Sequence, residues 1–245
     1  MRGQAVTGLT EGLRQAVAFL TPLGGARAPS SDALRWFPVI GLGLGLALGG
    51  IWWGAGRLWP PPVAAALVVA ADLGLTGLLH VDGLTDSADG LLPPLDRERR
   101  LEVMATPGVG AFGMATVVVV LLLRWSALAS MTPHPLVLAA LWCVSRTAMV
   151  IIAAALPYVR PGGLAAPFLG GRWVATGVAG TLAALALSVW WRPVAGPLVV
   201  AAAVAGAAAV AVLARRRIGG FTGDVLGAGG MMAETLGLVA AAARW

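Results

Sequence analysis

The sequence predicts an all-α protein: a polytopic membrane helix bundle with six or seven transmembrane helices and an N-terminal interfacial helix. Hydrophobic residues make up 58% of the chain and charged residues only 11%, whereas soluble domains average about 25% charged residues. The mean hydropathy is +0.85, and the apolar residues gather into runs of about 20, the length of a helix that crosses a bilayer. We therefore expect one integral membrane domain, 1–245, with an interfacial helix and loop in 1–35 and the transmembrane bundle in 36–245.

The N-terminal segment has the pattern of a helix that lies on a membrane surface. Apolar residues recur at helical spacing between Val6 and Leu20, opposite a polar face that carries Glu11, Arg14 and Gln15. No long apolar core or small-residue cleavage site follows, so a removable signal peptide is not expected. An amphipathic helix in the interface of the inner leaflet fits this pattern.

Six apolar runs predict membrane-spanning helices, at 38–58, 62–79, 111–131, 136–157, 173–191 and 196–214. Glycines at 41, 43, 45, 49 and 50 in the first run favour close packing against a neighbouring helix. Three prolines at 60–62 force a tight turn into the second run. A seventh run, 225–243, contains Glu234, so it is either a seventh span or a re-entrant or interfacial helix.

The arginines predict the orientation of the chain. All seventeen basic residues are arginine, and with the N-terminus inside twelve of them fall on inner segments and three on outer segments. The inner arginines are Arg2, Arg14, Arg27, Arg35, Arg97, Arg99, Arg100, Arg160, Arg172, Arg215, Arg216 and Arg217. Because positive residues gather on the cytoplasmic side of spans, the N-terminus is expected to be cytoplasmic. The same bias explains a pI near 11.3 without a nucleic-acid partner.

The densest acidic motif of the chain follows the second apolar run. His80, Asp82, Asp86 and Asp89 lie within ten residues, and on a helix the three carboxylates share a stripe of roughly 60°. Like charges in one stripe repel unless a cation neutralises them, and hard oxygen ligands suit a divalent ion such as Mg²⁺. Gly83 and Gly90 would let a phosphate approach the backbone. The alternative is a solvated acidic loop outside the membrane.

A glycine-rich segment directly after the triple arginine is the second candidate. There, Thr222, Gly223 and Asp224 precede an apolar run on the same side of the membrane as the acidic motif. Asp224 could join the metal ligands, while Thr222 and backbone N–H groups hold phosphate oxygens at a helix N-terminus. Asp224 could equally be only a helix N-cap.

Charges inside the spans need partners because the bilayer does not solvate them. Arg146 either pairs with Asp72 or faces a water-filled cavity and binds an anionic substrate. Arg124 lies nearer the outer end of its helix, where snorkelling to the interface is expected. Arg160 lies on the inner side, where it would clamp a phosphate or help to fix the topology.

His80 is a candidate base or phosphate ligand because it adjoins the carboxylates. On a continuous helix its side chain points nearly opposite that of Asp82, so a catalytic role requires a break near Val81 or Asp82.

Several motifs together resemble one family of membrane enzymes. The run LHVDGLTDSADGL at 79–91 closely resembles the signature of the cobalamin synthase, or adenosylcobinamide-GDP ribazoletransferase, family of bacteria and archaea. Further similarity lies in FLTPLGG, RWFPVIGLGLGLALG, RERRLEVM through GVGAFG, SRTAM with LPYVRPGG, and GGFTGDVLGA. The resemblance covers almost the whole chain. The sequence departs from the family pattern at Pro22, at Thr106 and Pro107, and at Met231, so roles of those positions are not carried over.

The resemblance implies a membrane transferase that joins adenosylcobinamide-GDP to α-ribazole or α-ribazole 5′-phosphate and releases GMP in the last steps of cobalamin biosynthesis. It implies Mg²⁺ as cofactor, the bacterial cytoplasmic membrane as location, and an active site on the cytoplasmic side. The residues that match the signature are His80, Asp82, Gly83, Asp86, Asp89, Gly90 and Asp224. Membrane lipid surrounds such a protein, and a homo-oligomer or a complex with other cobalamin-pathway proteins is compatible with this interpretation.

Combining the residues with the resemblance, we expect Asp82, Asp86, Asp89 and Asp224 to hold one or two Mg²⁺ ions, and Arg146 and Arg160 to contact phosphate oxygens. Two alternatives use the same residues. One is a phosphotransferase that acts on a CDP-alcohol, and the other is a cation transporter whose carboxylates bind ions in transit.

Overall fold

The computed structural model describes residues 2–25, 30–160, 165–166 and 173–244, and the side chains from residue 10 onward. Its regular elements are all helical and confirm the predicted fold class. The helices are α1 (Arg2–Leu20), η1 (Pro22–Gly24), η2 (Ser31–Trp36), α2 (Phe37–Leu58), α3 (Pro61–Leu75), α4 (Leu79–Leu91), α5 (Arg97–Val103), α6 (Ala111–Ser130), α7 (Pro135–Ala155), α8 (Val174–Trp191), α9 (Ala195–Ile218) and α10 (Gly223–Ala241). Arg27 and Arg172, two of the arginines assigned to the inner side, lie outside the described residues.

Five of the described helical segments are long and apolar enough to cross a membrane: Ser31–Leu58, Ala111–Ser130, Pro135–Ala155, Val174–Trp191 and Ala195–Ile218. A sixth candidate is the pair α3 and α4, which is bent by 89°. The prediction of one straight span over 62–79 is therefore wrong, because the helix ends at Leu75 and restarts at Leu79. The run 225–243 forms a single helix, α10, which is largely buried among its neighbours. This helix is not among the candidate membrane spans.

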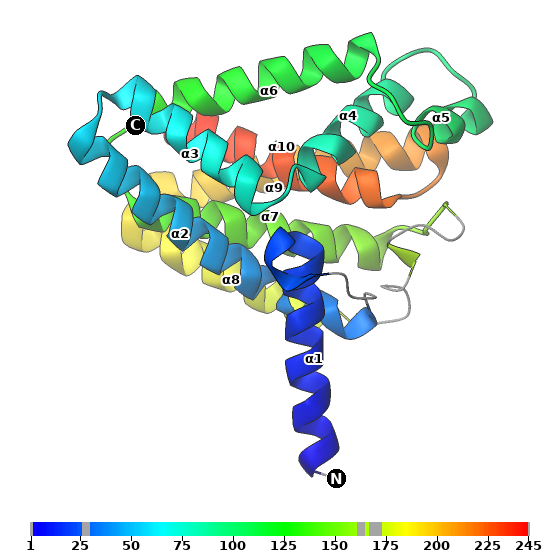
Figure 1. Cartoon of the computed structure of the whole chain (residues 1–245), viewed down its shortest axis with the longest axis horizontal. Coiled ribbons are helices and arrows are strands. Elements are labelled where there is room, and N and C mark those ends of the chain that lie inside the picture. The colour runs from blue at the N-terminus through cyan, green and yellow to red at the C-terminus, as the bar shows by residue number, and fades with distance from the viewer. Residues whose placement is uncertain (1, 26–29, 161–164, 167–172, 245) are drawn as a thin grey trace.

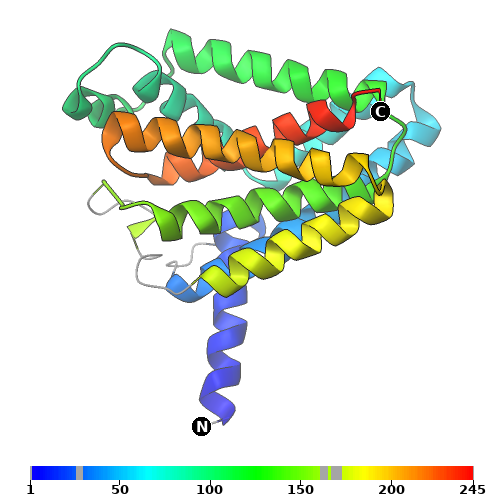
Figure 2. The same ribbon diagram turned by 180° about the vertical axis from the view of Figure 1, so that it is seen from behind.

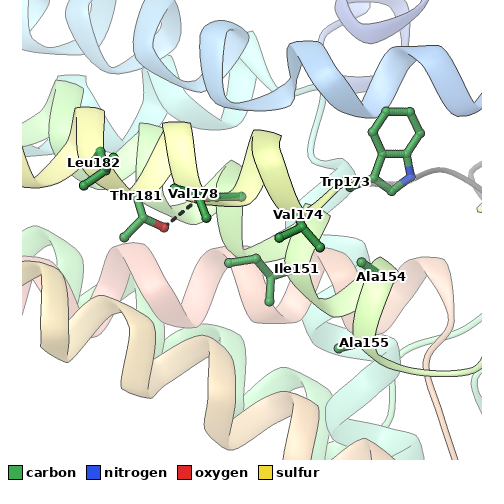
Figure 3. Close-up of a pocket in the computed structure, with 9 residues that line it drawn as sticks. Ile151, Ala154, Ala155, Trp173, Val174, Val178, Thr181 and Leu182 are labelled. Carbon is green, nitrogen blue, oxygen red and sulfur yellow. Dashed lines mark hydrogen bonds between the residues drawn. The ribbon is translucent and has the colours of Figure 1, made fainter.

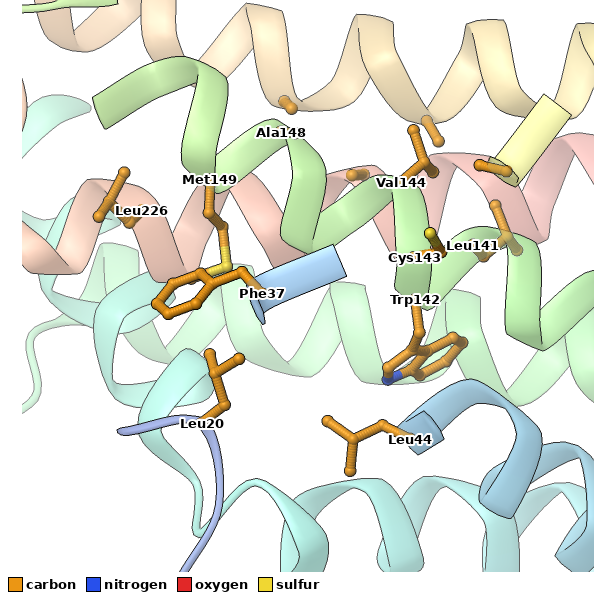
Figure 4. Close-up of a cluster of buried hydrophobic side chains, with 14 of the residues drawn as sticks. Leu20, Phe37, Leu44, Leu141, Trp142, Cys143, Val144, Ala148, Met149 and Leu226 are labelled. Carbon is orange, nitrogen blue, oxygen red and sulfur yellow. The ribbon is translucent and has the colours of Figure 1, made fainter. Parts of the chain in front are cut away.

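Helix α7 forms the centre of the bundle. Of its 21 residues, 15 are buried inside the protein. Figure 4 shows Met149 of α7 beside Phe37, with Leu20 and Leu226 close by, and α2 and α10 pack directly on this helix. A polar residue on α7 is consequently surrounded by protein rather than lipid.

Helix α2 packs on α7 through glycines spaced four residues apart. A Cβ atom at Gly49 would lie 2.5 Å from the Pro135 Cα, and one at Gly41 or Gly45 would clash with a carbonyl oxygen of α7. These three glycines confirm the predicted close packing. A Cβ atom added at Gly43 or Gly50 would have no other atom within 4 Å, so these two glycines point away from α7.

The long helices run side by side, and the connections expected to be cytoplasmic gather at one end (Figure 1). This end holds α5 and the segment before α10, whereas the C-terminal end of α10 lies at the opposite end. Seen from behind, α8 and α9 cover the face opposite α2 and α3 (Figure 2). Helix α1 runs across the bundle axes and away from the bundle, the direction expected for an interfacial helix.

Candidate active site

The break between α3 and α4 redirects the acidic motif. Gly77 and Leu78 both have positive φ, at 57° and 62°, and Thr76 donates a hydrogen bond to the Asp72 carbonyl at 2.7 Å. The chain therefore leaves α3 in a left-handed turn and α4 begins at a steep angle to it. The break lies at 76–78 rather than at Val81 or Asp82, so His80 and Asp82 share one continuous helix. Both nevertheless line the cavity described below, so access of His80 to the site does not require a break between them.

Helix α4 then packs closely on the N-terminal part of α10. A Cβ atom at Gly83 would lie 2.8 Å from the Asp224 carbonyl oxygen, and one at Gly227 would lie 3.4 Å from the His80 Cα. Gly83, predicted to bind substrate, is buried in this helix crossing. Because Gly83 has no side chain, α4 and α10 approach closely, and Asp82 and Asp86 come near Asp224.

The crossing borders a cavity of about 530 Å³ at the end of the bundle that holds α5. Its polar lining consists of His80, Asp82, Asp86, Thr106, Tyr158, Arg160 and Asp224, together with Gly223. Asp82 is exposed, while Asp86 and Asp224 are half-buried. The Asp86 carboxylate interacts electrostatically with Asp224, Asp82 and Arg160. Three carboxylates predicted as metal ligands thus converge on one cavity with one arginine.

Asp224 is held by two neighbours at the edge of this cavity. Its Oδ2 accepts hydrogen bonds from Arg160 Nη1 at 3.1 Å and from the Thr222 hydroxyl at 3.2 Å. Burial raises the pKa of Asp224, and Arg160 and Thr222 oppose this shift. The N-cap of α10 is Thr222, whose Oγ1 accepts from the Val225 N–H at 3.3 Å. The alternative of Asp224 as the N-cap is therefore wrong, and the Thr222 hydroxyl is already engaged.

Asp89 points to a different part of the molecule. Its two carboxylate oxygens accept hydrogen bonds from Gly110 N–H at 2.7 Å and from Gly113 N–H at 2.8 Å. These are the N-cap and third residues of α6, which has no capping side chain of its own. Asp89 therefore caps α6 from a neighbouring helix. Gly90, predicted to bind substrate, instead packs against Met104 and Arg100 of the α5 region.

His80 and Tyr158 bring polar atoms to the cavity that have no hydrogen-bond partner within the described protein. The imidazole of His80 is 4% exposed, and its Nε2 is buried and unpaired. The same holds for the Tyr158 hydroxyl, whose ring packs on Phe221. Burial raises the pKa of Tyr158, and Arg160 opposes this shift. Sequence reasoning missed Tyr158, although it lies two residues before Arg160 in the motif LPYVRPGG.

The two arginines within the spans form a buried network with two acids. Arg124 pairs with Asp72 at 3.1 Å and with Glu234 at 2.5 Å, while Arg146 pairs with the other oxygen of Glu234 and with Ser145. All four charged side chains are at least nine-tenths buried. The prediction that Arg124 snorkels is wrong. Arg146 is in an ion pair as one alternative proposed, with Glu234 rather than Asp72, and it lies outside the cavity lining.

The donor set of the cavity fits Mg²⁺ in its chemistry. Within the described ranges, no group of three or more acidic, histidine or cysteine side chains is close enough to hold a metal unaided. Mg²⁺ is commonly held by one or two carboxylates together with waters and substrate phosphates. Asp82, Asp86 and Asp224 can supply the carboxylates, and a diphosphate in the cavity would supply the phosphate oxygens.

A second large hollow lies between α7 and α8 (Figure 3). It has a volume of about 560 Å³ and is lined by apolar side chains such as Ile151, Val174 and Leu182. The hydroxyl of Thr181 is bonded within its own helix, to the Gly177 carbonyl at 2.8 Å. With no charged lining residue, this groove is unsuited to phosphoryl chemistry.

Comparison with known proteins identifies the family of this chain. The cobalamin-5-phosphate synthase family model matches residues 12–242. The chain belongs to this family. The match spans every residue that lines the cavity, from Phe19 to Gly227. The resemblance predicted from the motifs is thereby confirmed.

Curated relatives cover nearly the whole chain. A protein of Chlorobium phaeovibrioides called adenosylcobinamide-GDP ribazoletransferase is 36% identical over 91% of this chain and 92% of its own length. One of the same name from Chlorobium phaeobacteroides is 38% identical over 92% and 94%, and one from Ralstonia pickettii is 35% identical over 87% and 86%. No solved structure matches the chain.

Proposed function

We propose that this family member is a Mg²⁺-dependent adenosylcobinamide-GDP ribazoletransferase of the phosphotransferase class. It would join adenosylcobinamide-GDP to α-ribazole, or to α-ribazole 5′-phosphate, and give adenosylcobalamin or its 5′-phosphate. The observation that carries this proposal is the convergence of Asp82, Asp86, Asp224 and Arg160 on one cavity. The names of the relatives favour this reaction over a CDP-alcohol transferase or a cation transporter.

The reaction exchanges one bond to phosphorus for another. The ribose 5′ oxygen of the acceptor attacks the phosphorus that carries the cobinamide, a new P–O bond forms, and the anhydride bond to GMP breaks. The hydroxyl proton passes to a base in the cavity, and GMP leaves with the anhydride electron pair. Such transfers depend on positioning and on neutralising phosphate charge more than on covalent help from the protein.

The lining residues supply these functions in the proposal. Arg160 is held at the cavity by Asp224 and can donate to phosphate oxygens in a fixed orientation. Asp82 or His80 accepts the hydroxyl proton. Asp82, Asp86 and Asp224 would hold Mg²⁺, which, when bound, neutralises the charge of the diphosphate. The Tyr158 hydroxyl is an unpaired donor available to a substrate oxygen.

The catalytic test is GMP formation from adenosylcobinamide-GDP and α-ribazole by the purified protein in nanodiscs. GMP formation that requires Mg²⁺ is the expected result. CMP release from a CDP-alcohol would support the competing transferase, and flux of Mg²⁺ or protons into liposomes without substrate would support transport. Absence of GMP from folded protein would contradict the proposal.

The proposal places the cavity on the cytoplasmic side of the bacterial inner membrane, as the arginine distribution predicts. The orientation can be tested by labelling introduced cysteines, because the native Cys143 is buried and should not react with the label. Single cysteines at the exposed positions Arg216 and Thr132 mark the two ends of the bundle. A membrane-impermeant maleimide added to spheroplasts should label Thr132→Cys and spare Arg216→Cys. The reverse pattern would contradict the orientation.

A further inference from the structure

The cavity is too small for the whole donor. Pockets of about 300–1,000 Å³ enclose drug-sized molecules, and this cavity measures about 530 Å³. Adenosylcobinamide-GDP combines a corrin macrocycle, an adenosyl ligand and a guanine nucleotide, and is several times drug-sized. The cavity can enclose the reacting diphosphate and a nucleoside acceptor, so the corrin ring must lie outside it.

Three large apolar side chains that lie in or near the segments lining the cavity are exposed. Leu23 is 78% exposed, Leu78 is 53% exposed and Val109 is 62% exposed. We call these three residues the apolar rim. Val109 itself lines the cavity, Leu78 precedes the lining residue Leu79, and Leu23 follows the lining residue Phe19 by four positions.

The parts of the apolar rim that come from η1 and from the α3–α4 turn are in contact. A Cβ atom at Gly77 would lie 3.0 Å from the Pro22 Cγ, so Leu23 and Leu78 follow two residues that touch. Figure 1 shows the C-terminal end of α1 beside the turn between α3 and α4. These two parts of the rim therefore lie side by side.

Leu78 is held in a conformation that leucine rarely adopts. With φ 62° and ψ 0° it is left-handed, and among the described residues it is the one non-glycine with positive φ. Asparagine or glycine would adopt this conformation more readily. Its side chain is about half exposed, and backbone strain of this kind collects at ligand sites.

We propose that the apolar rim binds the corrin macrocycle of the donor, while the cavity holds the diphosphate and the acceptor. This inference rests on the proposed function. The flat corrin ring offers a wide apolar face to the two leucines and Val109, and its peripheral amides can remain in water. Binding outside the cavity also leaves the attacking hydroxyl free to reach the phosphorus from within.

The test compares donors with and without the ring. Leu78→Asn retains the left-handed conformation and Leu23→Asn keeps the size, while both remove the apolar contact. The control is Leu58→Asn, 75% exposed at the far end of α2. Since burial of one leucine contributes a tenfold or larger factor in binding, KM for adenosylcobinamide-GDP should rise about tenfold in each rim variant. The value of kcat and the KM for α-ribazole should stay within twofold of the wild type.

The second donor is a GDP ester of a short amino alcohol, which lacks the corrin. Rim variants should use it as the wild type does. Equal losses with both donors would overturn the proposal and indicate that the rim contacts lipid. An unchanged KM for the full donor would overturn it as well.

Direct binding separates this inference from the proposed function. Adenosylcobinamide without GDP absorbs visible light and can be titrated against nanodiscs without any turnover. We expect the wild type and Leu58→Asn to bind it and the rim variants to bind about tenfold more weakly. Equal binding by all four proteins would overturn the rim assignment, whereas failure of the wild type to release GMP would count against the proposed reaction alone.

Discussion

Gly83 and Asp224 touch backbone to backbone where α4 crosses α10. A methyl group on Gly83 would meet the Asp224 carbonyl oxygen at 2.8 Å and its Cα at 3.1 Å. Two backbones this close fix the separation of the carboxylates that each helix brings to the cavity. The geometry of the candidate site therefore depends on a residue without a side chain.

Gly83→Ala should separate the two helices and impair the site. Overpacking of this kind costs about 1–3 kcal/mol of stability, and a displacement near 1 Å can lower kcat about 100-fold. Thermal unfolding and GMP formation measure the two effects. Gly43→Ala is the matched control, because nothing lies within 4 Å of its added carbon, and it should behave as the wild type. Full activity in Gly83→Ala would show that the crossing tolerates expansion.

Asp89→Ala should weaken the start of α6 without changing the metal dependence. The variant loses two hydrogen bonds to the backbone of α6, and loss of a cap costs about 0.5–2 kcal/mol. The melting temperature should fall, while the Mg²⁺ concentration for half-maximal activity stays at the wild-type value. A large increase in that concentration would instead restore Asp89 to the metal ligands predicted from the sequence.

The acidic motif illustrates what helical periodicity predicts and what it omits. The spacing of Asp82, Asp86 and Asp89 correctly predicted a helix with the carboxylates on one stripe. Periodicity gives the angle around a helix, but seven residues also advance about 10 Å along it. Asp82 and Asp86 therefore reach the cavity, while Asp89 lies beside the start of α6.

The buried charges show a similar limit. Their low number and their position within apolar runs predicted that Arg146 and Asp72 need partners. Partner choice depends on the order of helices in the bundle, which hydropathy does not encode. Glu234 was the residue of this network that was hardest to predict, because it belongs to α10. The sequence did not decide whether this helix spans the membrane.

Glu234→Gln should destabilise the bundle more than any surface substitution. Glu234 joins Arg124 of α6 to Arg146 of α7, and breaking a buried ion pair from one side costs about 3–5 kcal/mol. Thermal unfolding in detergent measures this loss. Glu98→Gln serves as the control, since Glu98 is 83% exposed and its pair with Arg97 is 3.9 Å long, and it should melt as the wild type does. Equal melting of the two variants would mean that the network contributes no stability.

Asp82→Asn should abolish turnover and leave the fold intact. Asp82 is exposed at the cavity, so the substitution removes a charge without opening the core. Loss of one group that stabilises the transition state lowers kcat about 100-fold or more, and loss of a metal ligand should also raise the Mg²⁺ concentration for half-maximal activity. The control is Glu102→Gln, an exposed acid paired with Arg99 on α5, which should retain full activity. GMP formation over a Mg²⁺ titration, with thermal unfolding of the same samples, distinguishes loss of chemistry from loss of structure. Wild-type turnover in Asp82→Asn would remove this residue from the site, and the remaining carboxylates, Asp86 and Asp224, would then have to hold the ion.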